Sequence, residues 1–271
     1  MIRFAARTDV GKRDGENQDA IGADPDHGTW FIADGMGGHA AGSVASGIVK
    51  STLLELAGAV PLDHAILRAH EAVAANAAIQ PDHTGMGSTV VAAQLTGSSC
   101  TIAWVGDSRA YLWSRDRLQA VSRDHSLVEG LREQQGLSDT MVREHPNRHM
   151  VTQTLGLGNP VPSRTDVRLR AGDLILLCSD GLNDELTDTA IAEVLRANPT
   201  PEGAGDALIA AALEHGGNDN VSVVLVAYDG RGKGEPATPL QARTIVLLSV
   251  VAGVTVALAV AALWWLLYGK H

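Results

Sequence analysis

Two hydrophobic patterns alternate along the first 229 residues. Short apolar runs bounded by Gly, Pro, Asn or Asp predict β-strands, and apolar residues recurring every three to four positions predict helices. We expect strands at 2–8, 29–33, 88–95, 101–105, 110–113, 164–169, 174–178 and 221–228. We expect helices at 41–56, 62–78, 127–135, 188–197 and 202–214. Because many strands follow one another without a helix between them, the pattern predicts an α+β fold of antiparallel sheets with helices packed outside.

The hydrophobic pattern changes after residue 229. Residues 230–243 are rich in Gly and Pro and have no apolar period, which is typical of a linker. Residues 244–268 form a stretch of 25 residues without charge, long enough for a helix to cross a bilayer. Basic residues lie mainly before this stretch, and only residues 269–271 follow it. The sequence therefore predicts a single-pass anchor in the cytoplasmic (inner) membrane, with residues 1–229 as a cytoplasmic domain.

Charge and cysteine content restrict the partners of this domain. Residues 1–243 hold all 31 acidic residues and 20 of the 21 Lys and Arg residues (all but Lys270), a formal charge of −11. Such a surface repels phosphate backbones, so we expect no nucleic-acid ligand. Cys100 and Cys178 lie far apart in apolar runs, which indicates buried thiols in a reducing compartment.

Candidate functional residues lie where apolar runs begin or end. Asp34, Asp107 and Asp180 follow such runs, and Asp219 precedes the last one. Each could be a turn residue, and Asp34-Gly35 and Asp180-Gly181 could each form a hairpin turn. Four such aspartates instead suggest that several strand ends bring carboxylates to one place, where only a cation would let them stay ionised. An oxygen-only set suits Mg²⁺ or Mn²⁺.

The stretch Gly35 to Ala40 has a rival interpretation. G-M-G-G-H-A fits the dinucleotide-binding pattern G-x-G-x-x-A between a strand and a helix. However, Asp34 would direct its charge at the pyrophosphate. The acidic residue about twenty positions on, Glu55, falls inside a helical pattern rather than at a strand end. We therefore discount nucleotide binding.

Seven motifs occur in an order that resembles one family. They are N-Q-D (Asn17–Asp19), A-D-G-M-G-G-H (Ala33–His39), G-S-T-V-V-A-A (Gly87–Ala93), V-G-D-S-R-A-Y (Val105–Tyr111), R-D-H-S (Arg123–Ser126), C-S-D-G-L (Cys178–Leu182) and N-D-N-V-S (Asn218–Ser222). This set is similar to that of the bacterial metal-dependent protein serine/threonine phosphatases of type 2C. The similarity covers roughly residues 3–229.

The resemblance implies a four-layer α/β/β/α sandwich of two antiparallel sheets with a two-metal site at one end. Asp34 would bridge two Mn²⁺ or Mg²⁺ ions, and Gly35 would bind one of them through its carbonyl. Asp180 and Asp219 would hold the other. A backbone carbonyl can act as a ligand where no side chain blocks the approach, which glycine permits.

The same resemblance implies roles for further residues. Asp19 would act in the outer shell, accepting from metal-bound water. Asp124 matches a position that helps to bind a third, weaker metal together with Asp180. Asp107, Ser108 and Arg109 would form a polar network that fixes a turn.

The activity implied is hydrolysis of phosphoserine and phosphothreonine in proteins by a hydroxide bridging two divalent metals. The partners implied are phosphorylated proteins and a cognate serine/threonine kinase. A regulatory module of the same fold that binds phosphoproteins without hydrolysing them is the main alternative. A two-metal nuclease is a third interpretation, which conflicts with the negative charge.

The sequence departs from the family pattern at several positions. Family members have an arginine five residues before the first-motif aspartate, where this chain has Asp14; a bulge at Gly15 would let Arg13 bind the substrate phosphate instead. Gln18 replaces the commoner glutamate. Eukaryotic members have a histidine, proposed as general acid, where this chain has Met36. His39 and His125 are the local histidines, and we expect packing or hydrogen-bonding roles for both.

Residues 126–150 resemble the family's mobile flap beside the site. This segment is charged and interrupted by proline, as expected of a cover rather than a core element. His145 and His149 are four residues apart, but Pro146 breaks the helix that such a metal-binding pair needs. We therefore expect no metal role for either histidine.

Overall fold

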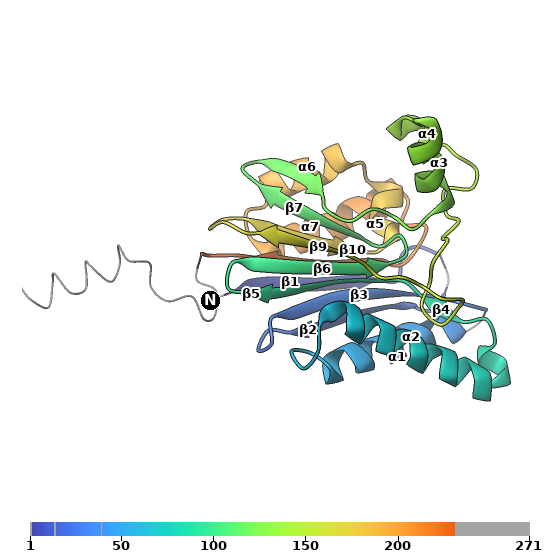
Figure 1. Cartoon of the computed structure of the whole chain (residues 1–271). Helices are drawn as coiled ribbons and strands as arrows, with labels where there is room; N and C mark the ends of the chain where they lie inside the picture. Colours follow the sequence, from blue (N-terminus) through green and yellow to red (C-terminus); the bar gives the residue numbers. More distant parts are fainter. Residues whose placement is uncertain (1, 14, 39, 231–271) are drawn as a thin grey trace, which may run out of the picture. The chain divides into compact units, whose positions relative to one another are not determined.

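Two antiparallel sheets lie face to face between two helical layers (Figure 1). The computed structural model describes residues 2–13, 15–38 and 40–230. Sheet A has the strand order β1-β11-β10-β7-β8: β1 (Arg3–Asp9), β11 (Val221–Ala227), β10 (Leu174–Cys178), β7 (Arg109–Ser114) and β8 (Arg117–Ala120). Sheet B has the order β2-β3-β5-β6-β9, with β4 paired to β3: β2 (Asp19–Asp24), β3 (Thr29–Met36), β4 (Gly87–Ser88), β5 (Val90–Thr96), β6 (Ser99–Val105) and β9 (Ser163–Arg168).

Helices cover the outer face of each sheet. On sheet B lie α1 (Ala41–Glu55) and α2 (Leu62–Ile79), followed by the short 3₁₀ helix η1 (Pro81–His83). On the side of sheet A lie α5 (Asp180–Glu185), α6 (Asp188–Ala197) and α7 (Pro201–His215). The flap, residues 126–150, contains α3 (Leu127–Gln135) and α4 (Asp139–Arg143). An antiparallel bridge joins its first residue, Ser126, to Val151, which follows its last residue.

Three apolar layers hold the four structural layers together. Along β3, Trp30 and Ile32 belong to the core between the sheets, whereas Phe31 belongs to the core under α1 and α2. Along β10, Ile175 faces the inter-sheet core and Leu176 faces α6 and α7. This alternation is the two-residue period of a strand that is buried on both faces. The α+β sandwich expected from the sequence is confirmed.

The structure corrects the sequence-based elements where polar residues dominate. β2, β4, β8, α4 and α5 were not expected. Neither Asp-Gly pair forms a hairpin turn: Asp34 and Gly35 continue β3, and Asp180 and Gly181 begin α5. In the second case Ser179, extended at the N-cap position, starts a helix directly from the end of β10.

The expected anchor at 244–268 lies outside the described residues, as do most of the linker at 230–243 and the tail at 269–271. Within residues 2–13, 15–38 and 40–230, no helix has the length and apolar character needed to span a bilayer.

Gly22 and Gly47 provide a matched test of the packing. Gly22 pairs with Phe31 across β2 and β3, and a Cβ at Gly22 would overlap the buried Phe31 ring. We expect Gly22→Ala to lower the free energy of unfolding by about 1–3 kcal/mol, because the ring must move. Gly47 lies exposed on α1 with open space around it, so Gly47→Ala should raise that free energy by up to about 1 kcal/mol. Urea denaturation measures both, and equal effects would contradict this packing.

Candidate metal centre

Polar contacts join the ends of the two sheets at one edge of the sandwich. Asp19, the first residue of β2, pairs directly with Asp34 near the end of β3. Ser179, which follows β10 in the other sheet, donates its hydroxyl to Asp19 Oδ2 at 2.8 Å. The Gln18 amide N–H donates to Asn220 Oδ1, just before β11, at 2.7 Å. Residues more than 150 positions apart in sequence are thereby held at one place.

Glycines allow the backbones at this edge to approach closely. A Cβ on Gly35 would overlap the carbonyl of Gly42 at the start of α1, and a Cβ on Gly42 would lie 2.8 Å from the Gly35 oxygen. A Cβ on Gly181 would likewise overlap the Asn220 carbonyl. The first contact seats α1 against the end of β3, and the second brings α5, with Asp180, against the segment that holds Asp219.

The carboxyl groups gathered here disfavour one another's ionisation. Burial raises the pKa of Asp34 well above its ordinary value, and the charges of Asp19, Asp180, Asp107 and Asp219 raise it further. Burial, followed by the charges of Asp107, Asp184, Asp219 and Asp19, raises the pKa of Asp180 in the same way. The structure therefore brings Asp34, Asp180 and Asp219 into one electrostatic cluster, as their positions at strand ends predicted.

Asp19 shows that this cluster fits a cation site. Burial raises the pKa of Asp19 to about 6, although hydrogen bonds from Ser222 and Ser179 lower it. Its Oδ1 atom is buried without a hydrogen-bond partner. A buried acceptor without a donor is costly, and water on a hard cation would supply that donor. The donor set consists of oxygens, as Mn²⁺ and Mg²⁺ require.

Asp107 and Asp124 have different surroundings. Burial, together with the charge of Asp124, raises the pKa of Asp107 to about 7. Both carboxylate oxygens of Asp124 accept from Arg109, at 2.8 and 2.7 Å. Ser108 shares a 2.8 Å hydrogen bond with Thr89. A cation at Asp124 would have to compete with Arg109, so the third-metal role of Asp124 stays a prediction.

One known protein family matches most of the chain. The family model for protein phosphatase 2C matches residues 11–214. The chain belongs to this family.

Two curated relatives and one solved structure illustrate the similarity. Serine/threonine protein phosphatase PstP of Mycobacterium tuberculosis is 37% identical over 239 residues, which are 84% of this chain and 46% of PstP. This chain thus spans about half the length of PstP. Serine/threonine phosphatase stp of Listeria monocytogenes is 35% identical over 77% of this chain and 87% of its own. The crystal structure of the PstP catalytic domain with two manganese ions has a TM-score of 0.75 at 35% identity, covering 83% of this chain and 97% of that one.

Sequence reasoning missed one group in this phosphatase 2C fold. The ligand atoms of His149, Asp180 and Asp184 all lie within 4.8 Å of one another, and no other such group of His, Cys, Asp or Glu occurs in the part of the chain that the structure describes. Asp180 and Asp184 are four residues apart on α5 and share one helical face. Interpreting S-D-G-L-N-D as a capped helix start would have revealed this spacing. His149 lies in this group, and the expectation that it has no metal role stays a prediction.

The remaining predicted residues are placed as follows. Arg13 is exposed, and its phosphate-binding role stays a prediction. His125 shares a 2.9 Å hydrogen bond with Ser163 and stacks on Trp104, which is the kind of role expected for it. Asp14 and His39 lie outside the described residues.

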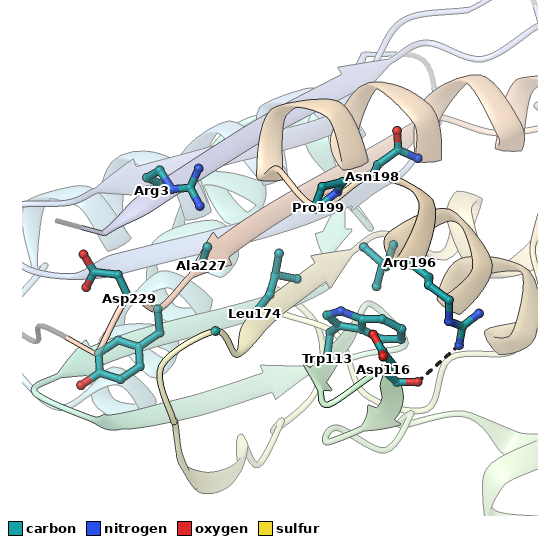
Figure 2. A pocket seen from close by; sticks show the side chains of 12 residues that line it. Arg3, Trp113, Asp116, Leu174, Arg196, Asn198, Pro199, Ala227 and Asp229 are labelled. Carbon is teal, nitrogen blue, oxygen red and sulfur yellow. Dashed lines mark hydrogen bonds between the residues drawn. The ribbon is translucent and has the colours of Figure 1, made fainter.

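A hollow lined by residues from sheet A and α6 lies away from the carboxylate cluster (Figure 2). This cavity of about 300 Å³ is lined by Trp113, Leu174 and Arg196 among others. The Arg196 guanidinium lies 5.7 Å from the centre of the Trp113 ring. Leu174 begins β10, whereas Asp180 follows its end, so this cavity is separate from the carboxylate cluster.

The clustered carboxylates predict an unusual pH dependence. A carboxyl group whose pKa is raised by folding stabilises the fold when protonated, and this contribution disappears as the pH rises through the folded pKa. From the values of about 6 for Asp19 and about 7 for Asp107, we expect the melting temperature in EDTA to fall by several degrees between pH 5 and pH 7.5. Mn²⁺ should restore it at pH 7.5.

Asp34→Asn should flatten this fall and reduce the gain from Mn²⁺, because it removes one of the repelling charges. Glu214→Gln, an exposed change on α7, should behave as wild type. Scanning calorimetry measures all three proteins. A pH profile that Asp34→Asn leaves unchanged would show that the charges do not repel one another.

Proposed function

We propose that this chain hydrolyses phosphoserine and phosphothreonine monoesters in proteins. The observation that carries the proposal is the convergence of Asp19, Asp34 and Asp180 from both sheets, with an orphaned acceptor on Asp19. Family membership and the names of the similar PstP and stp phosphatases support the same chemistry. The substrates would be products of a serine/threonine kinase, since only phosphoryl transfer to a hydroxyl makes them.

Asp34, Asp180 and Asp219 would hold two divalent cations. When bound, such a pair lowers the pKa of water and neutralises charge on phosphoryl oxygens. The Gly35 carbonyl would be a further ligand. Asp19 would orient metal-bound water by accepting a hydrogen bond from it. Arg13, which is exposed, would bind the substrate phosphate. Arg13→Ala should then raise KM, and unchanged KM and turnover would contradict this role.

No thiol competes as a nucleophile among the described residues. Burial raises the pKa of Cys100 to about 12, and burial also raises that of Cys178. Both thiols are enclosed in the core and remain protonated at neutral pH. A covalent phosphocysteine is therefore disfavoured, and direct attack by water is the simplest route.

We also propose that residues 244–268 tether this domain to the inner face of the cytoplasmic membrane. The support is the length of the uncharged stretch and the basic residues that precede it. The full chain should stay with membranes after a carbonate wash, and Val256→Arg combined with Leu258→Arg should release it. Wild-type protein in the carbonate supernatant would exclude the tether.

Asp180→Asn tests the enzymatic proposal. We expect Mn²⁺-dependent hydrolysis of p-nitrophenyl phosphate and of a phosphothreonine peptide to fall at least about 100-fold, because a metal ligand is lost. Asp206→Asn makes the same chemical change on the exposed face of α7 and should leave the rate unaltered. If the wild type binds phosphopeptides but does not hydrolyse them, the chain is instead a binding module. Cleavage of DNA or RNA would indicate a nuclease.

A further inference from the structure

A buried tyrosine joins sheet A to α5 beside the metal centre. Tyr111 lies in β7, on the side of sheet A that α5 and α6 cover (Figure 1), and its side chain is fully buried. Asn183, on α5, donates from Nδ2 to the Tyr111 hydroxyl at 2.6 Å. Asn183 Oδ1 accepts from the Cys178 thiol, at the end of β10, at 3.0 Å. Both ends of the Asn183 amide are therefore tied to sheet A.

The Tyr111 hydroxyl uses its full hydrogen-bonding capacity, as donor and as acceptor. Burial raises the pKa of Tyr111, so the hydroxyl keeps its proton. It donates to Asp188 Oδ1, on the first residue of α6, at 3.0 Å. Besides the Asn183 amide, it accepts from Arg109 Nη1 at 3.4 Å, and the same guanidinium holds the Asp124 carboxylate. One oxygen atom thus connects α5, α6 and β7.

The orientation of α5 depends on contacts of this kind. The helix has only six residues, too few to be stable by itself, and it begins directly after β10. Asp180 is its first residue, and Asn183, three residues on, is a neighbour of Asp180 on the helix surface. The bond between Asn183 and Tyr111 therefore fixes the rotation of α5 about its axis, and with it the direction of the Asp180 carboxylate.

From this arrangement we infer that Tyr111 is a positioning residue of the metal centre. Its hydroxyl acts through Asn183 and sets the orientation in which Asp180 joins the other carboxylates. The inference rests on the proposed function and adds to it a residue that acts from inside the core. Loss of the hydroxyl then weakens metal binding and leaves the contacts of the substrate unchanged.

The rival explanation is that the hydroxyl only satisfies buried polar groups. In that case Tyr111→Phe lowers the melting temperature, because the Asn183 amide loses its partner in the core, but folded molecules bind metal as the wild type does. If Tyr111 positions Asp180, the folded variant binds Mn²⁺ more weakly. Loss of a group that orients a metal ligand typically costs about 10- to 100-fold in affinity or activity.

The test is a Mn²⁺ titration of the purified full-length chain by isothermal titration calorimetry, at a temperature at which circular dichroism shows each variant folded. We expect Tyr111→Phe to weaken Mn²⁺ binding by about tenfold or more. Tyr228→Phe is the matched control, because it deletes the hydroxyl of another buried tyrosine, which follows β11 at the end of that strand away from Asp219. It should bind Mn²⁺ as wild type.

A second variant removes the same hydrogen bond from the other side. Asn183→Leu keeps a side chain of similar size in the core and should weaken Mn²⁺ binding as Tyr111→Phe does. The double variant should bind no more weakly than either single variant, because both changes interrupt one path to Asp180.

Kinetics give a readout that a loss of stability alone would not move. With a phosphothreonine peptide, the Mn²⁺ concentration that gives half the maximal rate should rise about tenfold in Tyr111→Phe, while KM for the peptide stays unchanged. A smaller folded fraction would instead lower the rate at every Mn²⁺ concentration and leave this midpoint in place.

Four results would overturn the inference: unchanged Mn²⁺ affinity in folded Tyr111→Phe, equal weakening in Tyr228→Phe, additive losses in the double variant, or loss of folding in both Tyr111→Phe and Asn183→Leu. The last would show that the hydroxyl serves the fold as a whole. Failure of the proposed function has a different signature, namely a wild type whose Mn²⁺ binding depends on Tyr111 but which does not hydrolyse the phosphopeptide. A wild type that binds no Mn²⁺ would contradict both.

Discussion

Electrostatic repulsion among neighbouring carboxylates is the constraint on which the rest of this site depends. Asp19 and Asp34 come from one sheet, and Asp180 and Asp219 flank strands of the other. Each charge raises the cost of ionising its neighbours, as the raised pKa values of Asp19, Asp34 and Asp180 show. The fold tolerates this cost because three apolar layers hold the sheets and helices in place independently of the site. Divalent cations convert the same repulsion into binding affinity.

Small residues make this convergence possible. Gly35 and Gly42 let α1 meet the end of β3, and Gly181 lets α5 begin beside Asn220. Ser179 then links the sheets through its hydrogen bond to Asp19. Gly35, directly after Asp34, is therefore explained by backbone approach, since a side chain there would collide with Gly42 at the start of α1. The hollow lined by Trp113 and Arg196, beside the start of β10, has no comparable set of carboxylates.

The layers, and the gathering of the main acidic residues, could be predicted from the sequence. Buried strands appear in it as apolar runs, and the ends of these runs mark where polar groups collect. The sequence was insufficient where tertiary contacts decide. β2 has aspartates at both ends and Gly22 inside, so its pairing with β3 leaves no hydrophobic signal. The Asp124 carboxylate is occupied by Arg109, which only the fold brings near. Only the fold brings the His149 ring of the flap close to Asp180 and Asp184 of α5.

The most direct test of the central claim is the anomalous diffraction of crystals grown with Mn²⁺. Two peaks about 3.5–4 Å apart, with Asp34 contacting both and Asp180 and Asp219 contacting one, are the predicted result. A single peak, or peaks that do not touch these three aspartates, would contradict the claim that the strand ends form a two-metal centre.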